Sequence, residues 1–126
     1  MPTSFDYAAI RVVPRVERQE FINAGVVVFC LEKRYLAARI HLDEQRLKAL
    51  WPDIDIELVR EHLEAIPRIC AGDPAAGPIA RLSQRERFHW LISPRSTIIQ
   101  PSPVHTGLCE NTDELPERLA KQLLAI

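Results

Sequence analysis

Residues 25–31 read Gly-Val-Val-Val-Phe-Cys-Leu, residues 32–34 read Glu-Lys-Arg, and residues 35–41 read Tyr-Leu-Ala-Ala-Arg-Ile-His. The first run is unbroken and rich in β-branched side chains, which is typical of a strand that is covered on both faces. The charged triplet favours a connection into a second strand, in which the alternate residues 36, 38 and 40 place apolar side chains on one face. This stretch therefore predicts an antiparallel hairpin.

The segment before the hairpin predicts one further strand. Residues 5–13 carry aromatic and β-branched side chains on both faces, and Pro14 brings the strand to an end. Asn23-Ala24-Gly25 then predicts a turn with a left-handed residue, or alternatively an Asn23 amide that faces a ligand.

Amphipathic helices follow the hairpin. Asp43 can cap a short helix that Pro52 closes, and a second helix begins after Asp55. The apolar residues of the second helix recur at intervals of three and four as far as Cys70, which is the pattern of one stripe packed on a sheet. Pro67 interrupts this helix and predicts a kink or a break just before it, because proline removes one backbone hydrogen bond.

The C-terminal half adds two helices and a short strand. Ser83 and Glu86 have the spacing of a capping box, which predicts a short helix as far as Leu91. Residues 97–100 predict an edge strand, and the prolines at positions 101 and 103 predict an irregular segment after it. A last helix starts near Thr112. The fold class is α+β: a single domain over residues 1–126, with a mostly antiparallel sheet (the N-terminal strand plus the hairpin) and amphipathic helices packed on one face.

Composition excludes several classes of protein. The chain has 126 residues, 47% of them hydrophobic, and a formal net charge of −1. A near-neutral charge makes a nucleic-acid partner unlikely, since backbone phosphates are usually bound by a clear basic excess. No apolar run is long enough for a membrane span and the N-terminus lacks a signal peptide, so we expect a cytoplasmic protein without membrane contact. Three cysteines without paired spacing predict reduced thiols, and we expect neither a metal nor a cofactor.

A candidate binding segment runs from residue 85 to residue 107. In the turn Pro94-Arg95-Ser96-Thr97, a guanidinium fork and two hydroxyls could meet one carboxylate or phosphate group. The alternative is a structural turn in which Arg95 pairs with an internal acid such as Glu17 or Glu20. The sequence leaves both interpretations open.

The residues after this turn add a titratable group. Gln100 and the pair His105-Thr106 are expected beside the turn. An imidazole with a pKa near neutrality can move protons, so His105 is the best single titratable candidate in a loop beside Gly107. The alternative is a histidine that satisfies backbone groups within a tight loop.

Three more side chains complete the candidate set. Trp90 is a residue type that often dominates interfaces, and His89 precedes it. Arg11 lies in a strand otherwise made of Ala, Ile and Val. It therefore either projects from an open sheet face or is buried and paired with a carboxylate.

The chain also resembles a bacterial family known as domain of unknown function 3037. The resemblance rests on residues 7–18, Tyr-Ala-Ala-Ile-Arg-Val-Val-Pro-Arg-Val-Glu-Arg; on residues 20–26, Glu-Phe-Ile-Asn-Ala-Gly-Val; and on residues 87–91, Arg-Phe-His-Trp-Leu, through to His105-Thr106-Gly107. The family carries no assigned activity. The resemblance implies a partnership with a kinase similar to the HipA persistence kinases.

Two functions are therefore expected from different classes. The leading one is a non-enzymatic interaction or regulatory module that partners a HipA-like kinase through the segment from Arg95 to His105. The alternative is a small enzyme or ligand-binding domain that recognises a phosphorylated or carboxylated small molecule through the same segment. Convergence of these side chains in a concave pocket would favour the ligand, and their spread over a surface would favour the partner. A homodimer is also expected, because the apolar hairpin with Tyr35 could leave an edge or a face uncovered.

Overall fold

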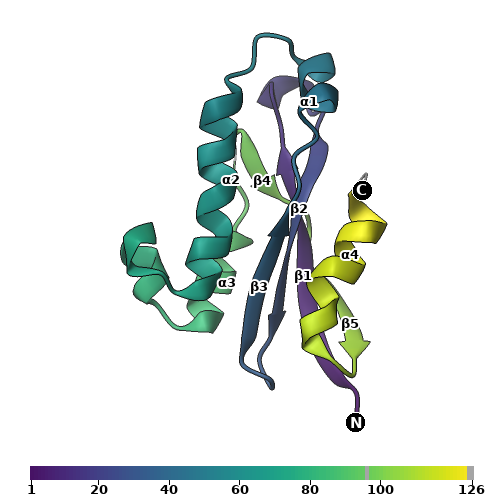
Figure 1. Ribbon diagram of the computed structural model, residues 1–126, viewed down its shortest axis with the longest axis vertical. Coiled ribbons are helices and arrows are strands. Elements are labelled where there is room, and N and C mark those ends of the chain that lie inside the picture. Colours follow the sequence, from purple (N-terminus) through teal and green to yellow (C-terminus); the bar gives the residue numbers. More distant parts are fainter. Residues whose placement is uncertain (96, 125–126) are drawn as a thin grey trace.

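The computed structural model describes residues 1–95 and 97–124 of the chain, and its centre is an antiparallel sheet (Figure 1). The strands are β1 (Thr3–Val12), β2 (Ile22–Cys30), β3 (Tyr35–Ile40), β4 (Ile99–Pro101) and β5 (His105–Cys109). Their order is β3-β2-β1-β4, and β5 also pairs with β1. One edge of β1 therefore carries β2, while the other edge is shared by β5 at its N-terminal half and β4 at its C-terminal end.

The predicted hairpin is confirmed, and it lies where the sheet is most deeply buried. Strands β2 and β3 pair in register from Gly25 with Ile40 to Cys30 with Tyr35. Residues 26–28 of β2 are at most 1% exposed, as a strand covered on both faces requires. Gly25 is needed here for space rather than for turning, because an added Cβ would lie 3.0 Å from the backbone oxygen of Arg39 as well as 2.7 Å from Ile40 Cδ1.

Helices cover both faces of the sheet. On one face lie α1 (Glu44–Leu50), α2 (Ile56–Ala71) and α3 (Gln84–Leu91), whose buried side chains join the larger hydrophobic cluster. On the other face lies α4 (Leu115–Leu123), which packs on a second cluster with Phe5 and Val26. Figure 1 shows α2 and α4 on opposite sides of the strands. Short 3-10 turns at Val16–Arg18, Pro74–Ala76, Pro78–Arg81 and Thr112–Glu114 complete the described elements.

The α+β class and the antiparallel sheet are thus confirmed, but α4 departs from the predicted packing of helices on one face. The reason lies in β2, which is apolar on both sides. Val27 and Phe29 face the larger cluster, whereas Val26, Val28 and Cys30 face α4. A strand of this kind leaves a second apolar face that only another element can remove from water.

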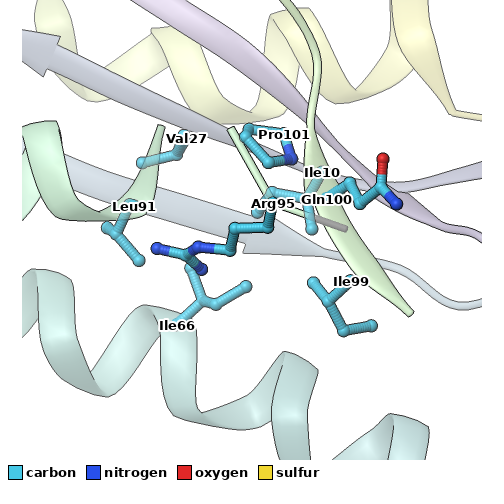
Figure 2. Close-up of a pocket in the computed structure, with 8 residues that line it drawn as sticks. All are labelled: Ile10, Val27, Ile66, Leu91, Arg95, Ile99, Gln100 and Pro101. Carbon is cyan, nitrogen blue, oxygen red and sulfur yellow. The ribbon is translucent and has the colours of Figure 1, made fainter. Parts of the chain in front are cut away.

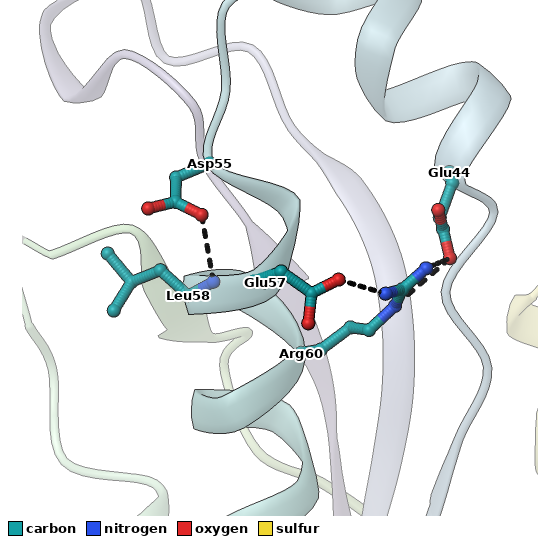
Figure 3. A network of polar contacts seen from close by, with 5 residues as sticks. All are labelled: Glu44, Asp55, Glu57, Leu58 and Arg60. Atoms are coloured by element: carbon teal, nitrogen blue, oxygen red, sulfur yellow. Dashed lines mark hydrogen bonds and ion pairs between the residues drawn. The ribbon is translucent and has the colours of Figure 1, made fainter.

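The predicted helix starts are confirmed by their caps. Asp43, Asp55 and Ser83 each accept a hydrogen bond from a backbone amide of the first turn, and Ser83 forms the full capping box with Glu86. Arg60 of α2 then ties the two N-terminal ends together, because its guanidinium bonds Glu44 of α1 and Glu57 of its own helix (Figure 3).

Helix α2 runs unbroken through Pro67, so of the two predicted alternatives, a kink or a break, the break is wrong. Buried residues lie on both sides of the proline, namely Val59, Leu63, Ile66, Ile69 and Cys70. A proline inside a helix costs roughly 3 kcal/mol. Burial of this many apolar side chains exceeds that cost, since each contributes about 1.5–3 kcal/mol.

Strand β5 is the element that the sequence did not predict. The segment after β4 was expected to be irregular, yet residues 105–109 pair with β1. Ser102 makes this return possible, because its amide donates to Ala9 O at 2.8 Å and its Oγ accepts from Ala9 N at 2.8 Å. Ser102 is 7% exposed and clamps the link between β4 and β5 to the middle of β1.

Candidate functional site

Five of the thirteen arginines are half-buried. The contacts of each guanidinium indicate whether it stabilises the fold or could bind a ligand. Arg39 pairs with Glu117 and Arg60 pairs with Glu44. Arg87 donates to three backbone carbonyls, two of them at the C-terminal end of α2. Arg11 and Arg95 have no carboxylate partner among the described residues.

Arg11 sits in the middle of a polar row that crosses three strands. It lies opposite Gln100 of β4 and opposite Asn23 of β2. Its guanidinium carbon lies 4.1 Å from the centre of the Phe21 ring. Within the described part of the chain, Arg11 Nε is buried without a hydrogen-bond partner. Of the two alternatives open at Arg11, pairing with a carboxylate is therefore not observed.

Arg95 packs against Trp90 of α3. Its guanidinium carbon lies 4.2 Å from the centre of the Trp90 ring, and the guanidinium donates to the Trp90 carbonyl. Figure 2 shows the guanidinium pointing toward Leu91 and Ile66. Burial in these apolar surroundings lowers the pKa of Arg95. The charge is therefore partly desolvated without a compensating anion.

Of the two alternatives open at Arg95, pairing with Glu17 or Glu20 is not observed. Glu17 pairs with Arg15, and Glu20 pairs with Arg18. Both acids are held by arginines of their own connection between β1 and β2, two residues away along the chain. Local pairs of this kind form more readily than a contact with the distant turn, because they close a much shorter loop.

Arg11 and Arg95 line one cleft of about 280 Å³. We call it the arginine cleft, and its walls are Arg11, Val13, Val16, Gln19, Phe21, Arg95 and Gln100. No Asp, Glu, His or Cys stands among these described lining residues. The arrangement supplies cationic and amide donors together with apolar walls, but no group that could act as a general acid or base near neutral pH.

Asn23 has a structural role. The predicted turn at Asn23 is wrong, since the residue lies within β2, next to an irregularity in the pairing with β1. Its Nδ2 donates to Leu123 O at 3.2 Å, which ties the C-terminal end of α4 to the sheet. Its Oδ1 is buried and has no partner among the described residues. Asn23 thus adjoins Arg11 but does not line the arginine cleft.

His105 and Thr106 lie away from the cleft. Both belong to β5 and not to the predicted tight loop, because they pair with Tyr7 and Asp6 of β1. The His105 ring lies 5.5 Å from the Tyr7 ring, and Thr106 Oγ1 donates to Asp6 Oδ1 at 2.7 Å. Four strand positions separate Tyr7 from Arg11, which is roughly 13 Å at the usual rise of a strand.

The remaining candidates divide between two other surfaces. Trp90 and Thr97 line a groove beside α2 together with Arg95. His89 lies on the far side of α3, in a cleft that includes Arg85 and Asp6. Ser96 lies outside the described residues. The predicted set therefore does not converge on one site. Arg11, Arg95 and Gln100 line the arginine cleft, whereas Trp90, Thr97 and again Arg95 line the groove beside α2.

Phe21, Val16 and Gln19 are lining residues that the sequence analysis missed. They belong to the connection between β1 and β2, where Phe21 is 42% exposed and Val16 is 37% exposed. The signal available in the sequence was two apolar residues within a connection otherwise rich in charged residues, a composition that predicts exposed apolar side chains.

Comparison with known proteins identifies the family. A family model described as a protein of unknown function (DUF3037) matches residues 7–124. The chain belongs to this family. No curated protein and no solved structure matches it. All the residues of the arginine cleft lie within the matched range of DUF3037.

The described residues offer neither a metal centre nor a membrane-spanning helix. They contain no group of three or more His, Cys, Asp and Glu side chains that could hold a metal ion. None of the helices within residues 1–95 and 97–124 combines the length and the apolar character needed to cross a bilayer.

Proposed function

We propose that this DUF3037 protein is a non-enzymatic binding module that holds a carboxylate or phosphate group in the arginine cleft. One observation carries the proposal. Among the described residues three half-buried arginines lack a carboxylate partner; Arg87 donates to three backbone carbonyls, whereas the other two, Arg11 and Arg95, line the same cleft. Guanidinium groups bind both kinds of anion through paired hydrogen bonds. An anion would compensate the desolvated charge of Arg95 and the unpaired charge of Arg11.

The surrounding residues favour binding over catalysis. Gln100 lies opposite Arg11 in the sheet and adds an amide to the same cleft. Phe21 holds the Arg11 guanidinium in one orientation, so less conformational entropy is lost when an anion binds. A hydrolytic or transfer reaction would require a nucleophile or a proton carrier, and the described lining residues offer neither.

A titration of anions tests this function. Isothermal titration calorimetry with sodium phosphate and with sodium succinate, at constant ionic strength, should detect binding to the wild-type protein. Arg11→Gln and Arg95→Gln should each weaken binding about tenfold, as expected for the loss of a charge-assisted hydrogen bond. Arg81→Gln is the matched control, because Arg81 is exposed and lies outside the cleft. Absence of binding to the wild type, or equal binding by all three variants, would refute the proposal.

A kinase similar to the HipA persistence kinases is the proposed macromolecular partner, and the family resemblance supports it. In this form of the proposal the anionic group belongs to the partner's surface. A pull-down from the native host should recover such a kinase with wild-type protein and with His105→Ala, which lies away from the cleft, but not with Arg11→Gln. Recovery of the kinase with all three proteins would show that the kinase does not bind through the arginine cleft.

A homodimer is a further proposal. The hairpin is covered on both faces, and Tyr35 packs against the cluster under α4. Two edge strands nevertheless support a dimer. One is β3, the hairpin arm that begins at Tyr35, and the other is β5, which has no Asp, Glu, Lys or Arg and in which Leu108 is 68% exposed. Light scattering at micromolar concentration distinguishes a dimer from a monomer.

A further inference from the structure

A second hollow adjoins the arginine cleft and shares Arg95 with it. This hollow, the α2 groove, has a volume of about 250 Å³. Its walls are His62, Ala65, Ile66, Ile69, Trp90, Arg95, Thr97 and Ile99. Apolar side chains and the Trp90 ring dominate this surface, whereas donors dominate the arginine cleft. One arginine therefore stands at the boundary between a polar and an apolar site.

The position of the Arg95 side chain links the two hollows. Its guanidinium covers Trp90 and points toward Ile66, while the Gln100 amide points the opposite way (Figure 2). The only hydrogen-bond partner of the guanidinium among the described residues is the Trp90 carbonyl. An anion in the arginine cleft would draw the guanidinium toward itself. That movement would uncover Trp90 and Ile66, and water would then meet apolar surface.

A small space beneath Arg95 extends the apolar surface toward the core. It measures about 20 Å³, which is enough for roughly one water molecule. Ile10, Val27, Leu91 and Pro101 belong to its walls, and Figure 2 shows them around the Arg95 side chain. Displacement of Arg95 would join this space to the α2 groove. An apolar chain is the occupant that such a lining favours.

Resting on the proposed function, we infer that the ligand is an amphiphile: a carboxylate or phosphate head that binds in the arginine cleft, joined to an unbranched apolar chain that lies along the α2 groove. Charge complementarity selects the head at Arg11, and the apolar walls around Trp90 select the chain. The chain covers the surface that Arg95 leaves when it turns toward the head. Head and chain therefore strengthen one another's binding.

A chain-length series on the wild-type protein tests the inference. The probes are linear alkyl carboxylates of two to ten carbons and alkyl phosphates of the same lengths, below their critical micelle concentrations, with alkanols as neutral controls. Calorimetry gives the affinity, and tryptophan fluorescence, measured in a Trp51→Phe background, reports on Trp90. Affinity should rise about two- to fourfold with each added methylene for one or both head groups, since burial of a methylene favours binding. The head group that binds more tightly at equal chain length shows whether the natural ligand carries a carboxylate or a phosphate.

Two variants distinguish binding of the chain in the α2 groove from binding of the head in the arginine cleft. Ala65→Phe fills the α2 groove and should abolish the dependence on chain length while short anions still bind; Ala49→Phe, on the exposed face of α1, is its matched control. Arg11→Gln should weaken every anion in the series. Thermal unfolding checks that each variant is folded.

The outcomes are distinct. Equal affinity for short and long anions would overturn the amphiphile while leaving the anion site in place. Alkanols that bind as tightly as carboxylates of the same length would overturn the coupling of head and chain. Failure of every anion to bind would overturn the proposed function, and the inference with it.

Discussion

Replacing Ser102 with alanine should remove the clamp that holds the C-terminal half of the sheet on β1. Ser102 Oγ accepts from the buried Ala9 amide at 2.8 Å and donates to Pro103 O at 2.9 Å. Alanine leaves the Ala9 N–H without a partner in a strand where Ala9 is 6% exposed. A buried donor without a partner costs about 1–3 kcal/mol, so we expect a loss of about 2 kcal/mol in the free energy of unfolding.

Urea denaturation followed by circular dichroism measures this loss, and thermal unfolding should show a midpoint roughly 6–10 °C lower. Ser93→Ala is the matched control, because the Ser93 hydroxyl also donates to a backbone carbonyl, at 2.7 Å, but is exposed. We expect a change below about 0.5 kcal/mol for the control. If Ser102→Ala unfolds within that margin of the wild type, the Ala9 amide has found another partner and the clamp is not the stabilising contact described above.

Three other predictions concern single side chains of the core and its edges. Burial raises the pKa of Cys70 to about 12 from the ordinary value of 9.0, so the folded protein binds more protons than the unfolded chain between these values. Stability should fall as the pH rises from 9 toward 12. The loss between pH 8 and pH 10.5 should be about 1–2 kcal/mol smaller in Cys70→Ala, as judged by urea titrations. Gly107→Ala would place a Cβ 2.8 Å from Phe5 Cζ and should cost about 1–3 kcal/mol, whereas Leu108→Ala, at a position 68% exposed, should change little. Arg87→Met would leave three carbonyls without their donor and should lower the unfolding midpoint by an amount equivalent to about 2 kcal/mol; an unchanged midpoint would show that water replaces the guanidinium.

The parts of the fold that were predictable are those with a local cause. The hairpin was evident from β-branched composition and a charged turn, and the helix starts were evident from Asp43, Asp55 and Ser83, because each cap bonds an amide only a few residues away. Strand β5 has no such local signature. It forms because Ser102 bonds Ala9 of β1, a residue 93 positions away in the sequence. The prolines on either side of Ser102 favoured an irregular segment instead, so the strand was not predicted.

The candidate site was predictable in part for the same reason. Arg11, Arg95 and Gln100 could be chosen by residue type, but their meeting depends on the register of β4 against β1, which composition does not specify. His105 was placed beside them because it is close in sequence. Strand pairing instead places His105 opposite Tyr7, away from Arg11 along β1. Phe21 was overlooked because its importance comes from the Arg11 ring contact, which only the folded chain creates.

The shared edge of β1 has a consequence for how the chain reaches its structure during synthesis. β1 is synthesised before the other four strands, and β2 can pair with it early, but the second edge of β1 stays unpaired until β4 and β5 are made. During that interval the nascent chain presents an unpaired strand that other polypeptides can join. Long-range pairing of this kind also slows folding. Slowing translation before residue 99 should therefore increase aggregation more than slowing it after residue 109.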